Sequence, residues 1–457
     1  MQKRYNKSLF IFRRDLRLSD NTALLEANRL SSQVTPCFIF DPRQVTKNPY
    51  KSQNALEFMV ESLKLLEKDI KQRDGRLLYF YGDTGEIVKR LLRDHDALFI
   101  NADYTPFSRG RDKALKDLCK KAGCDFHCMG DTLLNAPGTV LKKDGKPYTI
   151  YTPFYKVASV FPVSKPKRLS KLKLSKATTG FEDTAIINKL IAESNPTLFV
   201  QGGRSAGLKL LSKIKRLSEY DTERNIPELE ATTKLSTHNK FGTLSIREVY
   251  HTIVKQLGAD HALIRQLYWR DFFTHIAYHF PHVFSGCFHK KFDGLKWDNN
   301  RKYFNAWCKG KTGFPIVDAG MRQLNTTGNM HNRVRMIVAS FLVKDLHINW
   351  QWGEKYFATQ LVDYDPAVNN GSWQWAASTG CDAQPYFRIF NPWLQQKKFD
   401  PECRYIKAWI PELKTLAIAD IHNREEAESS ANGYPAPIVD HHLQKEWAEE
   451  MFADLGK

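Results

Sequence analysis

The sequence predicts an α/β domain built on a doubly wound parallel sheet, followed by a mostly α-helical domain. Two patterns support this fold class. Short apolar runs alternate with helical patterns through the first third of the chain, whereas long helical stretches separated by Gly and Pro follow Gly202 and Gly203. The 457 residues also exceed what one ordinary core organises. We therefore expect an α/β domain over residues 1–135, a linker over 136–200 and a helical domain over 201–457.

Five short runs in the first domain have the composition of buried β-strands. They cover residues 8–13, 34–41, 77–83, 97–103 and 124–130. Between the second and third runs, apolar residues recur at helical spacing from Leu56 to Ile70, behind an expected N-cap at Asn54. Strand, helix and strand in this order are typical of a parallel, Rossmann-like sheet of five strands. The first turn, "RRDLRLSDN", lacks the GxGxxG motif of a standard dinucleotide site.

The expected linker interrupts this alternation. It is rich in Pro, and its "SKPKRLSKLKLSK" stretch carries six Lys and Arg without an acidic residue. A run of this kind is usually a solvated surface, so we expect a long surface connection and no specific binding site there. The second domain then reads as long helices over residues 205–217, 245–257, 261–280 and 330–347.

The charge balance favours a polyanionic partner. The chain has 68 Lys and Arg against 50 Asp and Glu, a net charge of +18. Such a charge attracts nucleic acid through counterion release, although a merely solvated basic surface stays open as an alternative. Ten Trp add flat side chains that suit base stacking.

The compartment is expected to be the cytoplasm. The apolar run in "MQKRYNKSLFIFRRD" is too short for a signal peptide, and no stretch approaches the ~20 apolar residues of a membrane helix. We expect the eight Cys to be reduced. The Cys and His groups around residues 124–128 and 279–289 lack paired CxxC spacing, so we expect them to pack rather than to bind metal.

Several longer motifs occur in the order of one known family. "FRRDLRLSDNTAL" opens the chain, and "ATTKLS", "IRQLYWRDFF", "HNRVRMIVASFLVKDL", "DYDPAVNNGSWQWAASTG" and "PYFRIFNPWLQQKKFDPE" follow. Together they resemble the photolyase and cryptochrome family nearly end to end, and their variants resemble bacterial cyclobutane pyrimidine dimer photolyases. The resemblance implies light-driven repair of damaged DNA, in which excited reduced FAD passes an electron to a flipped-out pyrimidine dimer. It also implies a monomer that needs no metal.

The resemblance places FAD-binding residues on both sides of the helical region. The implied cofactor-binding residues are Tyr220, Thr232, Thr233, Lys234, Leu235, Ser236, Arg270, Arg335, Asp363, Tyr364, Asp365 and Asn369. Read from the residues alone, Asp363 and Asp365 would be a turn pair before Pro366. Asn369 is expected near the reactive flavin nitrogen, where a neutral amide tolerates several protonation states of the ring. Trp297, Trp350 and Trp373 fall on the family's electron-transfer chain and, with Asn369, are the implied catalytic residues.

The DNA and the lesion are implied to meet a second set of residues. These are Arg224, Gln266, Trp269, Asn332, Arg333, Met336, Trp375, Arg388 and Gln395. Gln266 departs from the Glu of many bacterial members and keeps only the N–H donor. Taken alone, residues 331–346 would read as an ordinary helix with a basic first turn.

A second, light-harvesting chromophore is not determined by the sequence. In "DYTPFSRGRD", Phe107 and Ser108 replace an Asn and a Glu of the bacterial folate-binding pattern. Methenyltetrahydrofolate, a deazaflavin and an empty pocket therefore stay open.

Three other functions compete with repair of cyclobutane dimers. A cryptochrome-type photoreceptor is disfavoured by "MHNRVRM" together with Trp269 and Trp375. A six-four photolyase is disfavoured because Asn332 and Arg335 occur where a His-based acid is expected. A DNA-binding protein without enzymatic activity would explain the charge but not "TTKLS" together with "NNGSWQWAAS".

Overall fold

The computed structural model describes residues 3–168, 171–191, 193–229, 231–426, 430–453 and 455. Contacts divide the chain into two compact units. Unit 1 comprises residues 1–196, 200–215 and 233–281, and unit 2 comprises 197–199, 216–232 and 282–457. The domain boundaries expected at residues 135 and 200 stay a prediction. Within the ranges described, no helix has both the length and the apolar character needed to span a bilayer.

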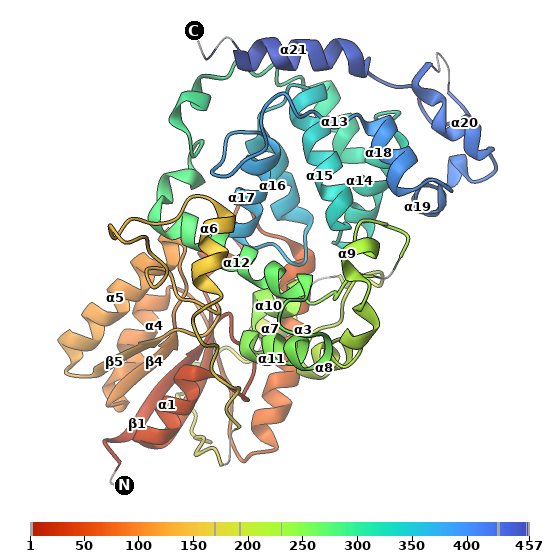
Figure 1. Ribbon diagram of the computed structural model, residues 1–457. Helices are drawn as coiled ribbons and strands as arrows, with labels where there is room; N and C mark the ends of the chain where they lie inside the picture. The colour runs from red at the N-terminus through yellow and green to blue at the C-terminus, as the bar shows by residue number, and fades with distance from the viewer. Residues whose placement is uncertain are drawn as a thin grey trace. The chain divides into compact units, whose positions relative to one another are not determined.

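Unit 1 contains a five-stranded parallel sheet with the strand order β3-β2-β1-β4-β5, as the sequence predicts. The strands are β1 (Tyr5–Phe12), β2 (Ser31–Phe40), β3 (Leu78–Tyr81), β4 (Ala97–Asn101) and β5 (Asp125–Met129). The order reverses between β1 and β4, which makes the sheet doubly wound. Figure 1 shows β1, β4 and β5 with the neighbouring helices in red and orange.

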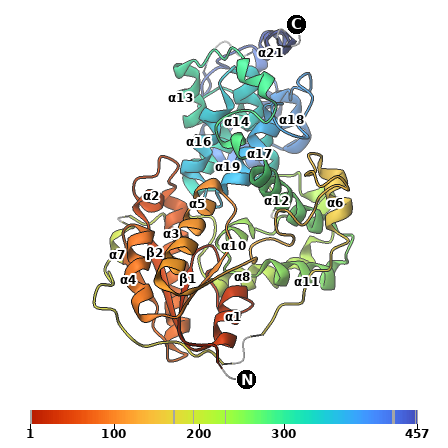
Figure 2. The same cartoon turned by 90° about the vertical axis from the view of Figure 1, so that its left-hand side faces the viewer.

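Helices connect the strands and cover both faces of the sheet. They are α1 (Thr22–Leu30), α3 (Gln53–Lys71), α4 (Thr84–Leu91) and α5 (Pro106–Ala122). Alternate strand residues such as Leu9, Ile11 and Leu98 pack with Val88 of α4 and Leu115 of α5 in one hydrophobic cluster, as a period of two requires. Figure 2 shows α4 and α1 on opposite sides of the strands.

Helix α3 begins earlier than the sequence predicts. Its N-cap is Ser52, whose side chain accepts a hydrogen bond from the Ala55 N–H, so the expected cap at Asn54 is wrong. The apolar periodicity starts only at Leu56, because the first residues of this helix do not all face the core. A helix start is therefore better located by its cap than by its first buried residue.

The Lys-rich stretch is more than an exposed connection. Val34 of β2 pairs with Leu174 in a parallel bridge, and the Val34 N–H donates to the Lys173 carbonyl at 2.8 Å. Leu172 and Leu174 are buried. The apolar residues that alternate with Lys thus extend the sheet beside the part of β2 that β3 does not reach.

The other helical elements of unit 1 lie between the strands or after β5 in the chain. They are α2 (Pro42–Val45), η1 (Leu92–Asp94), α6 (Tyr151–Ala158), α7 (Ile186–Lys189), α8 (Arg204–Leu211), α10 (Ser236–Phe241), α11 (Ile246–Leu257) and α12 (Ala262–His279). Helices α8, α11 and α12 match expected helices, but α8 stops at Leu211 and η2 (Ile214–Leu217) follows it.

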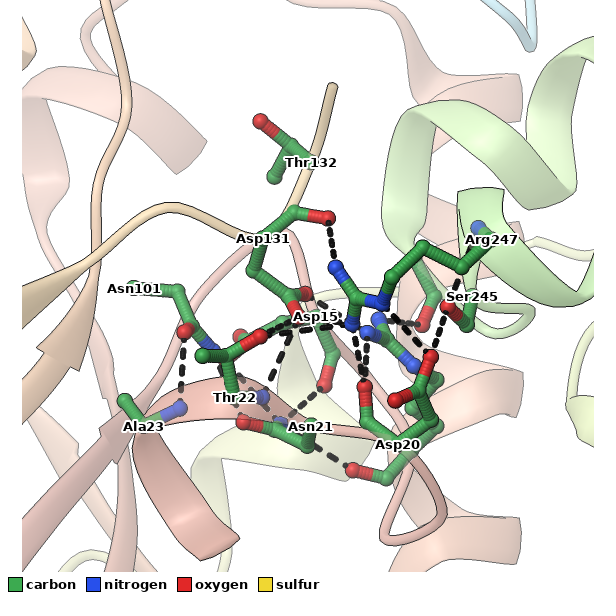
Figure 3. Close-up of polar contacts among 12 residues, drawn as sticks. Asp15, Asp20, Asn21, Thr22, Ala23, Asn101, Asp131, Thr132, Ser245 and Arg247 are labelled. Atoms are coloured by element: carbon green, nitrogen blue, oxygen red, sulfur yellow. Dashed lines mark hydrogen bonds and ion pairs between the residues drawn. The ribbon is translucent and has the colours of Figure 1, made fainter. Parts of the chain in front are cut away.

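A buried ionic network, the Asp131 cluster, joins α11 to the turn after β1 (Figure 3). Asp131 accepts from Arg17 at 2.6 Å, from Arg247 at 2.8 Å and from the Thr22 hydroxyl at 2.8 Å. Arg247 also pairs with Asp20 at 2.8 Å. Burial alone would raise the pKa of Asp131, but Arg17 and Arg247 lower it to about 2. The sequence motif "RRDLRLSDN" therefore stabilises unit 1 through paired charges.

Unit 2 is almost entirely helical, and its elements after α9 lie in chain order from residue 290 to 453. They are α9 (Tyr220–Glu223), η4 (Lys290–Gly294), α13 (Arg301–Lys309), α14 (Pro315–Thr327), α15 (Asn332–Ser340), η5 (Phe341–Asp345), α16 (Trp350–Gln360), α17 (Pro366–Ala376), α18 (Pro392–Phe399), α19 (Arg404–Trp409), η6 (Pro411–Leu413), α20 (Ile418–His422), η7 (Arg424–Glu426) and α21 (His441–Ala453). η3 (Pro281–Phe284) spans the passage from unit 1 into unit 2.

The helix expected over residues 330–347 is shorter in the structure. Helix α15 ends at Ser340, and η5 continues it as a π-helical turn from Phe341 to Asp345. A π-helical turn adds room for one more residue and is frequent at functional sites. All five residues of η5 are buried, including Lys344 and Asp345.

Candidate functional site

The uncharged stretch "PAVNNGSWQWA" forms helix α17. Asp365 is its N-cap and accepts from the Ala367 N–H at 3.1 Å, while Pro366 supplies a first helical residue with a fixed φ. The helix buries Asn369 and Trp373, which are four residues apart and share one face. Asp365 is thus a cap in this structure, and its expected cofactor role stays a prediction.

Two neutral amides attach α17 to the chain around Val283. Asn370 Nδ2 donates to the Val283 carbonyl at 2.9 Å, and Gln374 Nε2 donates to the same carbonyl at 3.1 Å. Gln374 Oε1 accepts from the Phe288 N–H at 2.7 Å. The polar residues of this stretch therefore satisfy buried main-chain groups without bringing a formal charge into the site.

Asn369 faces an acidic residue that the sequence reasoning did not find. Its Nδ2 donates to both the carbonyl oxygen and Oε1 of Glu354, at 3.1 and 3.0 Å. Burial raises the pKa of Glu354 to about 7, and the hydrogen bond from Asn369 opposes that rise. A sequence signal did exist, because Glu354 falls among the buried positions Trp350, Phe357 and Ala358 of an amphipathic helix.

Trp373 lies in an aromatic environment that depends on a neighbouring glycine. Its ring lies 4.9 Å from that of Phe357 and 6.2 Å from that of Trp307, both edge-on. A Cβ atom at Gly353 of α16 would lie 2.2 Å from the Trp373 ring. Only glycine therefore allows α16 to pack this closely against α17.

The three Trp implied in electron transfer belong to one hydrophobic region of unit 2. Trp350 and Trp373 are both 2% exposed members of its main cluster, and Trp297 packs against that cluster. The Trp297 ring contacts Phe452 of α21 edge-on at 6.3 Å. The order of buried to less buried rings agrees with a path toward the surface, but the relay role itself stays a prediction.

Arg335 and Asp363 are brought together as an ion pair. Their closest atoms, Arg335 NH2 and Asp363 Oδ2, lie 3.1 Å apart, and Arg335 Nε donates to the Met330 carbonyl at 2.8 Å. Tyr364 is half-buried and packs against the main hydrophobic cluster. The pair bridges α15 to the segment before α17, so the two Asp residues of "DYDP" have separate partners.

Another group of implied cofactor residues lies in unit 1. Thr233 Oγ1 accepts from the Leu235 N–H at 3.2 Å, and Lys234 has a φ of +55°. Ser236 then begins α10. Arg270 of α12 donates to the Thr132 carbonyl and, at 3.1 Å, to the Asn239 carbonyl. Thr232 is assigned to unit 2, at the point where the chain passes into unit 1.

These groups fit a dinucleotide cofactor by their chemistry. The hydroxyls of Thr233 and Ser236 and the cationic Arg270 suit phosphate oxygens. The amide oxygen of Asn239 is buried and has no hydrogen-bond partner within the described residues. It could therefore accept a hydrogen bond from a cofactor bound beside this segment. The set is thus compatible with FAD.

Tyr220, Arg224 and Arg333 are neighbours in unit 2. The Arg224 guanidinium lies 5.6 Å from the Tyr220 ring centre, and Arg333 NH2 donates to Asn225 Oδ1 at 2.7 Å. Burial and the charge of Arg224 both lower the pKa of Arg333. Two guanidinium groups that repel each other at close range attract an anion such as a phosphate.

The other implied lesion and DNA residues are distributed over both units. In unit 2, Asn332 Nδ2 lies 3.9 Å from Met336 Sδ on α15, Trp375 and Gln395 are half-buried, and Arg388 is exposed. In unit 1, Trp269 stacks on Tyr151 with ring centres 3.7 Å apart, and Gln266 is half-buried one turn earlier on α12.

Comparison with known proteins adds an independent line of evidence. Two family models match the chain, DNA photolyase over residues 8–170 and the FAD binding domain of DNA photolyase over residues 263–454. A deoxyribodipyrimidine photo-lyase of Synechococcus sp. is 36% identical and covers 98% of this chain and 96% of its own. That of Escherichia coli is 36% identical and covers 94% and 95%.

Solved structures give the same result. An archaeal photolyase from Sulfolobus tokodaii, whose crystals contain two FAD molecules, is 42% identical with a TM-score of 0.89 over 98% of this chain and 100% of its own. A bacterial class III photolyase from Agrobacterium tumefaciens is 35% identical with a TM-score of 0.91 over 100% and 98%. A cryptochrome from Synechocystis is less similar, at 26% identity and a TM-score of 0.84 over 99% and 100%.

Proposed function

The chain belongs to the DNA photolyase family, and we propose on this premise that it is a deoxyribodipyrimidine photo-lyase, which uses blue light to split cyclobutane pyrimidine dimers in DNA. The structural observation that carries the proposal is helix α17. This single uncharged helix has Asn369 and Trp373 on its buried face and the half-buried Trp375 two residues beyond Trp373. One helix would thereby carry the amide that faces the flavin, Asn369, the ring that is oxidised, Trp373, and the ring that contacts the lesion, Trp375.

Thr233, Ser236 and Arg270 of unit 1 would bind the phosphate oxygens of FAD. When bound in its reduced form, FAD supplies the photoexcited electron that opens the cyclobutane ring and is then returned. Asn369 would keep its neighbourhood neutral. Its Nδ2 is committed to Glu354, since the Glu354 carbonyl oxygen can only accept, and this leaves the Asn369 carbonyl oxygen as the acceptor for a flavin N–H.

The lesion would be received by an apolar ring and an amide. A dimer has lost its stacking, so flipping it out costs less than flipping an intact base, and Trp375 of unit 2 offers a flat surface to it. Asn332 and Met336 of the same unit would line the pocket that receives it. Arg224 and Arg333 would bind backbone phosphates, which makes binding salt-dependent and largely independent of sequence.

The electron-transfer chain has its own test. We expect Trp373→Phe to slow the photoreduction of oxidised FAD and to spare repair once the flavin has been reduced with dithionite. Absorption spectra under blue light measure the first, and repair of a dimer-containing oligonucleotide measures the second. Equal loss of both would argue against a relay role for Trp373.

The repair assignment is tested by incubating the reduced protein with a dimer-containing oligonucleotide in the dark and under blue light. We expect thymines to be restored only under light. Binding of FAD without restoration under light would overturn the proposal and favour a photoreceptor of the cryptochrome type.

We further propose a monomeric, cytoplasmic enzyme with a second chromophore. The Sulfolobus relative contains two FAD molecules, so a second flavin joins methenyltetrahydrofolate and a deazaflavin as a candidate. Extraction of the purified protein followed by fluorescence of the released chromophores would identify it.

A further inference from the structure

Lys344 of η5 is a buried cation whose partners all lie near the C-terminal helix. Its side chain is 1% exposed. The ammonium lies 3.5 Å from the centre of the Phe452 ring of α21 and donates to the Tyr386 carbonyl at 3.4 Å. The Phe452 and Tyr386 rings are themselves parallel, with centres 5.8 Å apart and an angle of 1°. Lys344 thus contacts the Phe452 ring and the Tyr386 main chain, and the Tyr386 ring stacks on that of Phe452.

Among the described residues, no carboxylate forms an ion pair with Lys344. Its neighbour Asp345 pairs instead with His441, the first residue of α21, at 2.5 Å. Burial lowers the pKa of Lys344 to about 7, without the opposing rise that a nearby acid would cause. A buried ammonium without an ionic partner is costly, and it persists only where the rest of the fold holds it in place.

Helix α21 provides that constraint through four separate contacts with η5 and with His347, two residues after it. Besides the His441–Asp345 pair and the Phe452–Lys344 contact, Gln444 Oε1 lies 2.8 Å from His347 Nε2. The Trp447 ring also lies 4.0 Å from the His347 ring. The last helix is therefore fixed at its beginning, middle and end to the segment that carries Lys344.

Tyr386 links this arrangement to the loop that carries Arg388, an implied DNA-binding residue. It belongs to the exposed loop "PYFR", in which the Arg388 N–H donates to the Pro385 carbonyl at 3.0 Å. Phe387 of the same loop is 59% exposed. Between this loop and α21 lies a cavity of about 290 Å³ lined by Tyr386, Phe387, Glu449, Glu450 and Ala453. Apart from the bond within the loop itself, Lys344 and Phe452 are the contacts that hold its main chain and one of its rings.

We propose that Lys344, clamped by α21, is a positioning residue for DNA binding: it fixes the Tyr386 main chain and so aims Arg388 at the DNA backbone. The inference rests on the proposed function, because Arg388 is a DNA-contacting residue only in that reading. Lys344 touches neither DNA nor flavin. It acts through Tyr386, and the charged ammonium binds both the carbonyl and the aromatic ring more strongly than the neutral amine does.

The expected pH dependence of DNA binding follows from the charge of the Lys344 ammonium, which has other titratable groups near it. Asp345 and His347 flank Lys344 in sequence, His441, Glu449 and Glu450 come from α21, and Asp382 and Arg388 come from the loop. Because the pKa of Lys344 lies near 7, the ammonium is present at pH 6 and largely lost at pH 8.5. DNA affinity of the wild type should fall over this interval.

The test measures binding of the full-length protein to a fluorescent dimer-containing duplex at pH 6, 7 and 8.5 for wild type, Lys344→Met, Lys344→Arg and Lys445→Met. Lys445 is an exposed residue of α21 and serves as the control. At pH 6 we expect Lys344→Met to weaken binding by roughly five- to tenfold, the change expected when a desolvated cation–π contact is lost. Lys445→Met should bind as the wild type does, and Lys344→Arg should keep its affinity at pH 8.5.

A salt titration separates positioning from direct contact. Arg388→Ala should lower the slope of log Kd against log salt concentration by about one phosphate contact. Lys344→Met should lower that slope by the same amount, because a displaced Arg388 no longer neutralises its phosphate, and the double variant Lys344→Met/Arg388→Ala should lower it no further. A double variant whose slope falls below that of either single variant, or an affinity of Lys344→Met equal to that of wild type at pH 6, would overturn the inference.

Measurements on the wild type alone distinguish a failure of the proposed function from a failure of the inference about Lys344. If the wild type binds dimer-containing and intact duplexes alike and restores no thymines under light, the repair assignment fails before any variant is compared. If Lys344→Met does not fold, Phe452→Leu removes only the ring and carries the same test. A Phe452→Leu protein that binds as tightly as wild type would contradict the inference.

Discussion

The Asp131 cluster of unit 1 and two buried acids of unit 2, Glu354 and Asp318, differ in how the protein accommodates a buried carboxyl group. Asp131 is fully buried yet keeps a pKa of about 2, because Arg17 and Arg247 compensate its charge. Glu354 and Asp318 of unit 2 are also buried, but their partners are neutral amides, hydroxyls and main-chain N–H groups. Burial therefore raises the pKa of Glu354 to about 7 and that of Asp318 to about 6.

The difference gives Asp131 and Glu354 opposite responses to pH. Asp131 has a lowered pKa, so it stabilises the fold above the ordinary value of 3.8, and this contribution is lost as the pH falls toward 2. Glu354 has a raised pKa, so its contribution is complete below the ordinary value of 4.5 and is lost as the pH rises toward 7. Asp131, which is paired with two Arg, therefore stays charged at neutral pH. Glu354, which has only neutral partners, changes its charge near pH 7.

Removing one cation from the Asp131 cluster should have the largest effect. Arg17→Met leaves Asp131 with a single Arg and removes donors to the Gly242 and Asp20 carbonyls. We expect a loss of about 3–5 kcal/mol in the free energy of unfolding, as for a broken buried ion pair. Urea denaturation followed by circular dichroism measures it.

The control for Arg17→Met is Arg29→Met, which breaks the exposed pair between Arg29 and Glu26. This variant should unfold at the same urea concentration as wild type, because exposed pairs contribute little. A stable Arg17→Met protein would show that the cluster does not depend on its charges.

Neutralising Glu354 should weaken the pH response of unit 2. Between pH 4.5 and 7 the wild type should lose about 3 kcal/mol of stability through this residue, since each pKa unit corresponds to about 1.4 kcal/mol. Glu354→Gln keeps the acceptor for Asn369 and cannot ionise, so its stability should change less over this range. Urea midpoints at several pH values measure the difference, and parallel curves for both proteins would contradict it.

Adding a methyl group at Gly353, against the Trp373 ring, should lower stability by a smaller amount. Gly353→Ala places a methyl group 2.2 Å from the Trp373 ring. We expect a loss of about 1–3 kcal/mol, typical of an overpacked core, together with slower photoreduction of FAD. Thermal unfolding and blue-light absorption spectra test both.

The matched substitution in unit 1 is Gly110→Ala, where nothing lies within 4 Å of the added Cβ. Alanine favours a helix, so this variant should be stabilised by about 0.5–1 kcal/mol. A similar loss in both variants would mean that the packing of α16 against α17 is not special.

Much of the fold was predictable because its signals are local. The five strands lie within two or three residues of their expected bounds at most of their ends, since apolar runs and turn residues decide where a buried strand forms. The errors occurred where a local rule was incomplete. The cap expected at Asn54 is Ser52 in the structure, and the helix expected over 330–347 ends at Ser340 and is followed by η5.

The sequence by itself also determined the family, because the motifs are continuous stretches whose order can be read along the chain. Only the tertiary structure decided which groups meet. Asn369 meets Glu354 from another helix, Lys344 meets Phe452 more than a hundred residues away, and Leu174 joins β2. These pairings, and the pKa values that follow from them, depend on burial and long-range packing, which no local pattern encodes.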